Sequence, residues 1–223
     1  ITLDIRQMRV ALSHLRALLP MGHGEKLNIE KTIDAICKNA GDIELVWEDK
    51  EKKAAKVLLL MDVGGSMTPY AKLVDRLFSA ATSQLSRFKH YYFHNCIYQN
   101  LWVDIERNES ISTDDFLKSI DKDYKVIIVG DAEMAPSELT WRNGAVDYYY
   151  YNDIPGIVWL QRIKDTFTDI IWLNPLSEKD WMSVQSVLMI RDIFPMFELT
   201  LDGIDDGVRF LMSQKKYYKA MVK

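Results

Sequence analysis

The chain has 223 residues, of which 48% are hydrophobic and 27% are charged. This length and composition are sufficient for a sizeable buried core. The formal net charge is −4, from 28 lysines and arginines against 32 aspartates and glutamates. General nucleic-acid binding is not expected, because it requires a basic electrostatic field.

Neither the cysteines nor the apolar segments indicate a secreted or membrane-spanning protein. Cys37 and Cys96 are the only cysteines and lack C-x-x-C spacing, so a disulfide framework or a thiolate zinc site is not expected. No apolar run reaches the length of a membrane span, and no signal-peptide pattern opens the chain. The expected location is the cytoplasm.

The first 41 residues predict two helices that form an N-terminal appendage, with a second unit over residues 42–223. Apolar residues recur at steps of three and four from Ile1 to Leu19, a helical pattern that ends near Pro20. This helix either docks a partner or packs on its own domain, and packing is favoured because most apolar helix stripes are core. A second helix is expected after Asn28, with Gly41 at its end.

Residues 43–47 alternate as a half-buried strand and are followed by the charged segment EDKEKK at 48–53. This segment leads directly into the next strand. The pattern predicts a hairpin between these two strands.

The strand at residues 57–61 is an unbroken apolar run, which is typical of a parallel strand buried on both faces. It ends at Asp62, and the chain then turns through Gly64 and Gly65 to Ser66. A helix is expected to begin at Thr68, with proline in the first helical position. A carboxylate and a hydroxyl therefore lie where open α/β sheets bind ligands.

Strands and helices alternate over the rest of the chain. This alternation predicts a doubly wound, mostly parallel Rossmann-like sheet with one antiparallel edge hairpin and right-handed crossovers. Further strands are expected at 91–98, 101–103, 126–129, 169–173 and 196–201, and helices from 112, 136, 157, 177 and 205.

Two aspartates are expected to meet at the carboxyl edge of this sheet. In the strand order 3-2-1-4-5-6, counted from the strand at 57–61, strands 1 and 4 are neighbours and end at Asp62 and Asp131. Ser66 lies in the first loop, and Thr113 opens the helix before strand 4. Such oxygen ligands suit Mg²⁺ or Mn²⁺.

Each of these residues also has a purely structural explanation. Asp62 and Asp131 could brace loops, Ser66 could form a loop hydrogen bond, and Thr113 could be a helix N-cap. Ser112 is the alternative hydroxyl at that helix start. The functional interpretation is favoured for Asp62, because Gly-Gly-Ser and a second strand-end aspartate accompany it.

The segment D-V-G-G-S-M at residues 62–67 resembles the D-x-S-x-S metal-ion-dependent adhesion site (MIDAS) of von Willebrand factor A (vWA) domains. Three further segments are similar to the bacterial CoxE-like branch of that family. They are HYYFHNC at 90–96, VGDAEMAP at 129–136 and WLNP at 172–175. The resemblance extends from about residue 42 to the C-terminus.

The resemblance implies a metal site in which hydroxyls coordinate the ion, aspartates act largely through water and a partner supplies an acidic side chain. Asp62, Ser66 and Asp131 match this pattern, and Thr113 matches less securely. Gly64 stands in place of the first serine and cannot be a ligand. The implied function is that of a non-enzymatic, metal-dependent adaptor working with a MoxR-type AAA+ ATPase to mature or activate a protein complex.

Two alternatives remain open. One is a Mg²⁺-dependent phosphohydrolase of the haloacid-dehalogenase type, with Asp62 as nucleophile and Gly130-Asp131 as a later motif. That chemistry needs a general acid two residues after the nucleophile, where this chain has Gly64. The other is a vWA-like domain that has lost its metal and binds partners by its surface alone.

Two further clusters are ambiguous. His90, His94 and Cys96 share strand parity, but no other histidine or cysteine completes a zinc spacing, so buried side chains are favoured. The tyrosines at 148–151 follow Asp147 and favour either a protein interface or packing of the loop on the domain.

Overall fold

The computed structural model describes residues 4–17, 25–27, 29–38, 45–49, 55–145 and 151–221. Its main element is a seven-stranded sheet in the order β6-β5-β4-β3-β7-β8-β9. The central strands pair in parallel, and β5 pairs antiparallel with β4 and β6 at one edge. The predicted mostly parallel, doubly wound sheet is confirmed. Its strands are β3 (Lys56–Asp62), β4 (Arg87–Phe93), β5 (Asn100–Trp102), β6 (Ser110–Ser112), β7 (Lys125–Val129), β8 (Ile170–Asn174) and β9 (Met196–Glu198).

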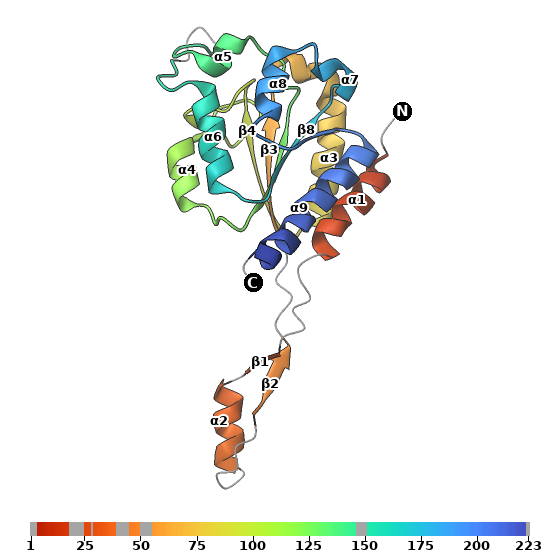
Figure 1. The fold of residues 1–223 in the computed structure, drawn as a ribbon, viewed down its shortest axis with the longest axis vertical. Helices are drawn as coiled ribbons and strands as arrows, with labels where there is room; N and C mark the ends of the chain where they lie inside the picture. Colours follow the sequence, from red (N-terminus) through yellow and green to blue (C-terminus); the bar gives the residue numbers. More distant parts are fainter. Residues whose placement is uncertain are drawn as a thin grey trace.

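Helices cover both faces of the sheet (Figure 1). The first face is covered by α1 (Ile5–Ala17), α3 (Ala71–Gln84) and α9 (Leu201–Met221). The second is covered by α4 (Thr113–Ser119), α6 (Gly156–Thr166) and α8 (Gln185–Arg191). Two short helices, α5 (Pro136–Thr140) and α7 (Glu178–Trp181), lie near the carboxyl ends of the strands.

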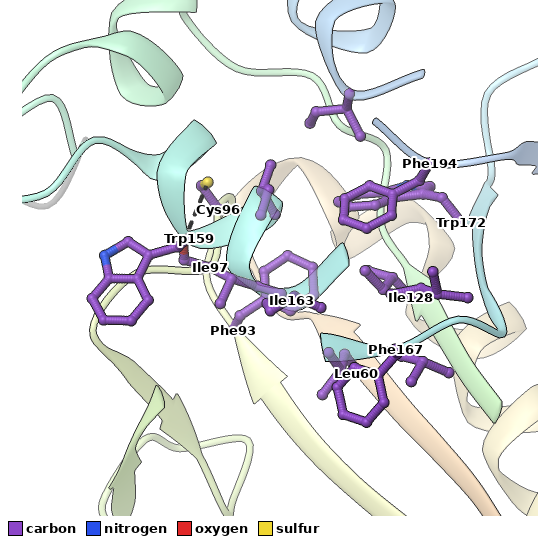
Figure 2. Close-up of a cluster of buried hydrophobic side chains, with 14 of the residues drawn as sticks. Leu60, Phe93, Cys96, Ile97, Ile128, Trp159, Ile163, Phe167, Trp172 and Phe194 are labelled. Carbon is purple, nitrogen blue, oxygen red and sulfur yellow. Dashed lines mark hydrogen bonds between the residues drawn. The ribbon is translucent and has the colours of Figure 1, made fainter. Parts of the chain in front are cut away.

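The apolar run of β3 reflects burial on both faces of this layered fold. Leu58 and Leu60 belong to the cluster under α4, α6 and α8, whereas Leu59 belongs to the cluster under α1, α3 and α9. Successive side chains of a strand point to opposite faces, so the residues at both odd and even positions of β3 must be apolar. Figure 2 shows part of the cluster under α4, α6 and α8, where Trp172 contacts the rings of Phe93 and Phe194.

The first helix is part of the core. Met8, Ala11 and Leu12 are buried, and they belong to the cluster that α3 and α9 cover. Packing on its own domain, which the sequence favoured over a docking role, is therefore confirmed for α1.

The second helix, α2 (Ile29–Lys38), lies between β1 (Glu25–Leu27) and β2 (Trp47–Asp49). These two strands form a separate antiparallel pair, and Figure 1 shows this unit away from the main sheet. Within it, Thr32 Oγ1 accepts a hydrogen bond from the backbone N–H of Val46 at 3.0 Å. The two N-terminal helices thus have different surroundings, and the boundary at residue 41 stays a prediction.

The hairpin predicted between residues 43–47 and β3 is wrong. β2 begins at Trp47 and pairs with β1, with Trp47 opposite Leu27. The antiparallel edge of the main sheet is instead built from β4, β5 and β6. Alternation of polar and apolar residues identifies a strand but not its partner. Residues 43–44 and 50–54 lie outside the described residues.

The segment after β3 also differs from the prediction. A 3₁₀ helix, η1 (Gly65–Tyr70), precedes α3, and Pro69 lies inside it. The N–H of Met67 bonds to the carbonyl of Gly64 at 3.0 Å, so the chain already turns before Thr68. The strand expected at 91–98 is β4, which begins earlier, at Arg87, and ends at Phe93. Asn95, just beyond it, adopts a left-handed conformation with φ of 56°.

Two further observations concern the cysteines and the helices. Both cysteines are free thiols, with Cys37 exposed and Cys96 buried. Among the described residues, no helix has both the length and the apolar composition that crossing a bilayer requires.

Candidate metal centre

Asp62 and Asp131 lie at the carboxyl ends of adjacent strands. The register pairs Met61 of β3 with Val129 of β7. Asp62 directly follows Met61, and Asp131 lies two residues after Val129. Both aspartates are buried, with 3% and 2% of their surface exposed. The predicted order 3-2-1-4-5-6 is observed as β5-β4-β3-β7-β8-β9, and β6 adds an unpredicted seventh strand at the edge.

The two carboxylate oxygens of Asp62 have different surroundings. Oδ1 accepts hydrogen bonds from the backbone N–H groups of Gly64, at 2.8 Å, and Asn95, at 2.9 Å. Oδ2 is buried and has no hydrogen-bond partner among the described residues. A buried carboxylate oxygen without a partner costs free energy unless a cation or donor compensates it.

Burial raises the pKa of Asp62 from 3.8 to about 7. The N–H groups of Gly64 and Asn95 oppose this rise, whereas the negative charges of Asp131 and Glu138 add to it. Burial and the neighbouring negative charges thus both disfavour the ionised form of Asp62. A divalent cation would stabilise that ionised form.

Side chains and turns of the neighbouring strands hold Asp131 in place. Its Oδ1 accepts the N–H of Glu133 at 2.9 Å, and its carbonyl oxygen accepts Asn174 Nδ2–H at 2.8 Å. The indole N–H of Trp172 donates to the carbonyl of Gly130 at 2.7 Å. The aspartate is thus positioned by bonds to its own turn and to β8.

The two predicted hydroxyl ligands have contrasting environments. Ser66 is exposed on η1. Thr113 is fully buried, and its hydroxyl donates to the carbonyl oxygen of Tyr98 at 2.6 Å. The N-cap of α4 is Ser112, whose hydroxyl accepts the N–H of Asp115 at 3.4 Å, so the cap explanation of Thr113 is wrong.

The sequence analysis missed Asn95 and Glu138. Asn95 Nδ2–H donates to Glu138 Oε2 at 3.3 Å, and Glu138 Oε1 accepts the N–H of Ala135 at 3.1 Å. Glu138 is 2% exposed. Its position three residues after the N-cap of a proline-initiated helix is a recognisable capping signal. No local pattern indicates that Asn95 reaches it.

A comparison with known families finds a similarity over the N-terminal part of the chain. Residues 2–99 match the model of the family described as VWA domain containing CoxE-like protein. The chain carries a vWA-type domain. The resemblance was expected from about residue 42 to the C-terminus, and the match confirms it over residues 42–99 and begins earlier, at residue 2. The matched range includes Asp62, Ser66 and Asn95 and ends before Thr113 and Asp131. A search of curated proteins finds no match.

His90 of β4, with His94 and Cys96 just after this strand, does not belong to a metal-holding group among the described residues. His90 packs against the rings of Phe78, Phe88 and Tyr92, and burial lowers the pKa of its imidazole. Cys96 belongs to the core cluster on the other face, where burial raises the pKa of its thiol. Of the tyrosine run, residues 148–150 lie outside the described residues, and Tyr151 is 72% exposed.

The oxygen atoms of Asp62, Asp131 and Ser66 fit a hard divalent cation, provided that hydroxyl or water oxygens complete the ligand set of that ion. Within the described part of the chain, no three histidine, cysteine, aspartate or glutamate side chains form a group that holds a metal ion. Carboxylate, hydroxyl and water oxygens together suit Mg²⁺ and Mn²⁺. The unpartnered Oδ2 of Asp62 is the atom that most needs such an ion.

Proposed function

We propose that this vWA-type domain is a non-catalytic protein-interaction module that binds Mg²⁺ or Mn²⁺ at the edge formed by Asp62 and Asp131. The observation that supports the proposal is the buried Asp62 Oδ2, which has no hydrogen-bond partner among the described residues, near the buried charge of Asp131. When bound, the ion supplies positive charge and a coordination position for an incoming carboxylate.

The residues have distinct roles in this proposal. Asp62 and Asp131 carry the negative charge that attracts the ion. Ser66 presents an exposed hydroxyl on η1 and is the candidate ligand nearest to solvent. Thr113 is a weaker candidate, because its hydroxyl hydrogen is already bonded to Tyr98. A partner's acidic side chain completes the ligand set.

The partner we propose is a MoxR-type AAA+ ATPase or its client. The CoxE-like match over residues 2–99 supports this choice. The ATPase would hydrolyse ATP, and this chain would bind the client or the ATPase during maturation of a protein complex.

A phosphohydrolase is the less favoured function. Its general acid would have to stand at Gly64, and the amide of Asn95 fills the space next to that residue. An amide has no proton to transfer at neutral pH. A vWA-type domain without a metal is the other alternative, and the Mn²⁺ titration below separates it from the proposed metal-dependent module.

Mn²⁺ binding to the full chain tests the proposed site. Titration calorimetry should detect binding by the parent and lose it in Asp62→Asn/Asp131→Asn, which removes both charges and retains side-chain volume. The matched control is Glu133→Gln, which removes an exposed charge next to Asp131. Equal heats from the parent and the double variant would refute the site.

Partner binding tests the function. The affinity for a purified MoxR-type ATPase should fall when EDTA replaces Mg²⁺ and should fall similarly in Ser66→Ala. By linkage, the ATPase must tighten Mn²⁺ binding by the same factor. Binding that is unaffected by chelation would favour partner recognition by the protein surface alone.

A further inference from the structure

Gly64 has a backbone conformation that does not require glycine. Its φ of −60° and ψ of 159° lie in the ordinary extended region, which any residue can adopt. The absence of a side chain at this position must therefore have another cause. The cause is a neighbouring side chain.

The side chain of Asn95 occupies the space beside Gly64. A Cβ added to Gly64 would lie 2.0 Å from Asn95 Oδ1 and 3.1 Å from Asp62 Oδ1. The amide oxygen of Asn95 thus lies where a side chain at position 64 would begin, next to the carboxylate of Asp62.

Hydrogen bonds fix the orientation of this amide. Nδ2–H of Asn95 donates to Glu138 Oε2 at 3.3 Å, and Glu138 is itself held by the N–H of Ala135. A carboxylate accepts and cannot donate, so the nitrogen must face Glu138 and the oxygen must face Gly64.

The backbone of Asn95 is fixed at the same place. Its N–H donates to Asp62 Oδ1, and its φ of 56° lies in the left-handed region, where asparagine is better tolerated than most residues. Asn95 therefore contacts the aspartate through its main chain and presents a neutral oxygen through its side chain.

We infer that Asn95 Oδ1 is a ligand of the divalent cation and that Glu138 is a positioning residue that orients it. Amide carbonyl oxygens are suitable ligands for hard cations, and an added neutral ligand raises no charge repulsion with Asp62 and Asp131. The unpartnered Oδ2 of Asp62 is a second, independent observation that points to a cation ligand here. This inference rests on the proposed function.

Mn²⁺ affinity, measured by water-proton relaxation on the full chain, provides the test. Asn95→Gly keeps the left-handed backbone and the N–H bond to Asp62, and it should weaken Mn²⁺ binding at least about tenfold. Asn143→Gly is the matched control, because Asn143 has a similar φ of 54° and has no hydrogen bond to the site residues among those described. It should bind as the parent does.

A ligand exchange gives a second readout. Gly64→Ser in the parent would meet Asn95 Oδ1 and should weaken binding, whereas Gly64→Ser combined with Asn95→Gly removes that contact and supplies a hydroxyl. The double variant should bind Mn²⁺ more tightly than either single variant. Thermal unfolding of each variant shows whether the fold is retained.

Glu138→Gln tests the positioning role. The glutamine can still accept the Ala135 N–H, but its NH₂ group would face Asn95 Nδ2–H and turn the asparagine amide around. Mn²⁺ binding should weaken by about 10- to 100-fold, with no further loss when Asn95→Gly is added.

The outcomes separate this inference from the proposed function. If the parent and Asn95→Gly bind Mn²⁺ equally, Asn95 is no ligand, and the proposed site at Asp62 and Asp131 stands. If the parent does not bind Mn²⁺, both proposals fall. If only the Gly64→Ser/Asn95→Gly variant binds, Asn95 blocks the site and the inference is reversed.

Discussion

The backbone N–H of Asn95 donates to Asp62 Oδ1 at 2.9 Å, so the loop after β4 fixes the carboxylate at the end of β3. The same carboxylate oxygen accepts the N–H of Gly64. Both bonds use Oδ1, and Oδ2 is left without a partner among the described residues. This asymmetry gives one carboxylate both a structural oxygen and an oxygen available to a cation.

The free energy of unfolding should depend on pH through Asp62. Without metal, the folded-state pKa of about 7 exceeds the ordinary value of 3.8, so the folded state binds the proton more tightly between these limits. Stability should fall as pH rises from about 4 to 7 and level off above pH 7, with a limiting slope of about 1.4 kcal/mol per pH unit. Urea unfolding in EDTA at pH 5 and pH 8 measures this change.

Asp62→Asn is the reference for that measurement, because it cannot titrate. Relative to this variant, the parent should lose on the order of 2 kcal/mol between pH 5 and pH 8. Parallel pH dependences in parent and variant would contradict the raised pKa.

The buried pair at the start of β7 should contribute strongly to stability. Lys125 Nζ lies 2.9 Å from Asp169 Oδ2 and donates to the carbonyl of Leu211 at 2.7 Å, with 7% and 14% of the two charged side chains exposed. Lys125→Met should lower the free energy of unfolding by roughly 3 kcal/mol, because it leaves Asp169 without its cation. Urea unfolding at neutral pH measures the loss.

Lys56→Met is the matched control. Lys56 pairs with Asp121 and Asp123, whose side chains are about two-thirds exposed. Water and salt screen such pairs, so the free energy of unfolding should change far less. Similar losses from both lysines would show that burial does not distinguish the two pairs.

Packing of α1 on the core should appear as a loss of stability. Leu12 is 1% exposed in the cluster shared with α3 and α9, so Leu12→Ala should cost about 3 kcal/mol. Val10 on the same helix is 62% exposed, and Val10→Ala should change stability by less than about 0.5 kcal/mol. Chemical denaturation of both variants compares them. A negligible effect of Leu12→Ala would indicate that α1 docks elsewhere.

The purified chain should not hydrolyse phosphomonoesters. Gly64 has no acid to protonate a leaving group, and the neighbouring Asn95 amide cannot do so. p-Nitrophenyl phosphate with Mg²⁺ should give no turnover above buffer. Turnover that is abolished by Asp62→Asn would establish the phosphohydrolase instead.

The local pattern of the chain was sufficient to predict the central strands and both aspartates. Burial on two faces requires an unbroken apolar run, and such runs are visible at residues 57–61 and 126–129. The standard strand order then placed Asp62 next to Asp131. These properties depend on residues adjacent in sequence and on general rules of sheet topology.

Only the tertiary structure decided which distant groups meet. It paired β2 with β1 instead of β3, bonded the Thr113 hydroxyl to Tyr98, and brought Asn95 between Asp62 and Glu138. Strand periodicity does not encode a strand's partner, and residue type does not show where a loop side chain points. Such contacts arise from the packing of whole elements, because each loop takes its position from the strands and helices that it joins.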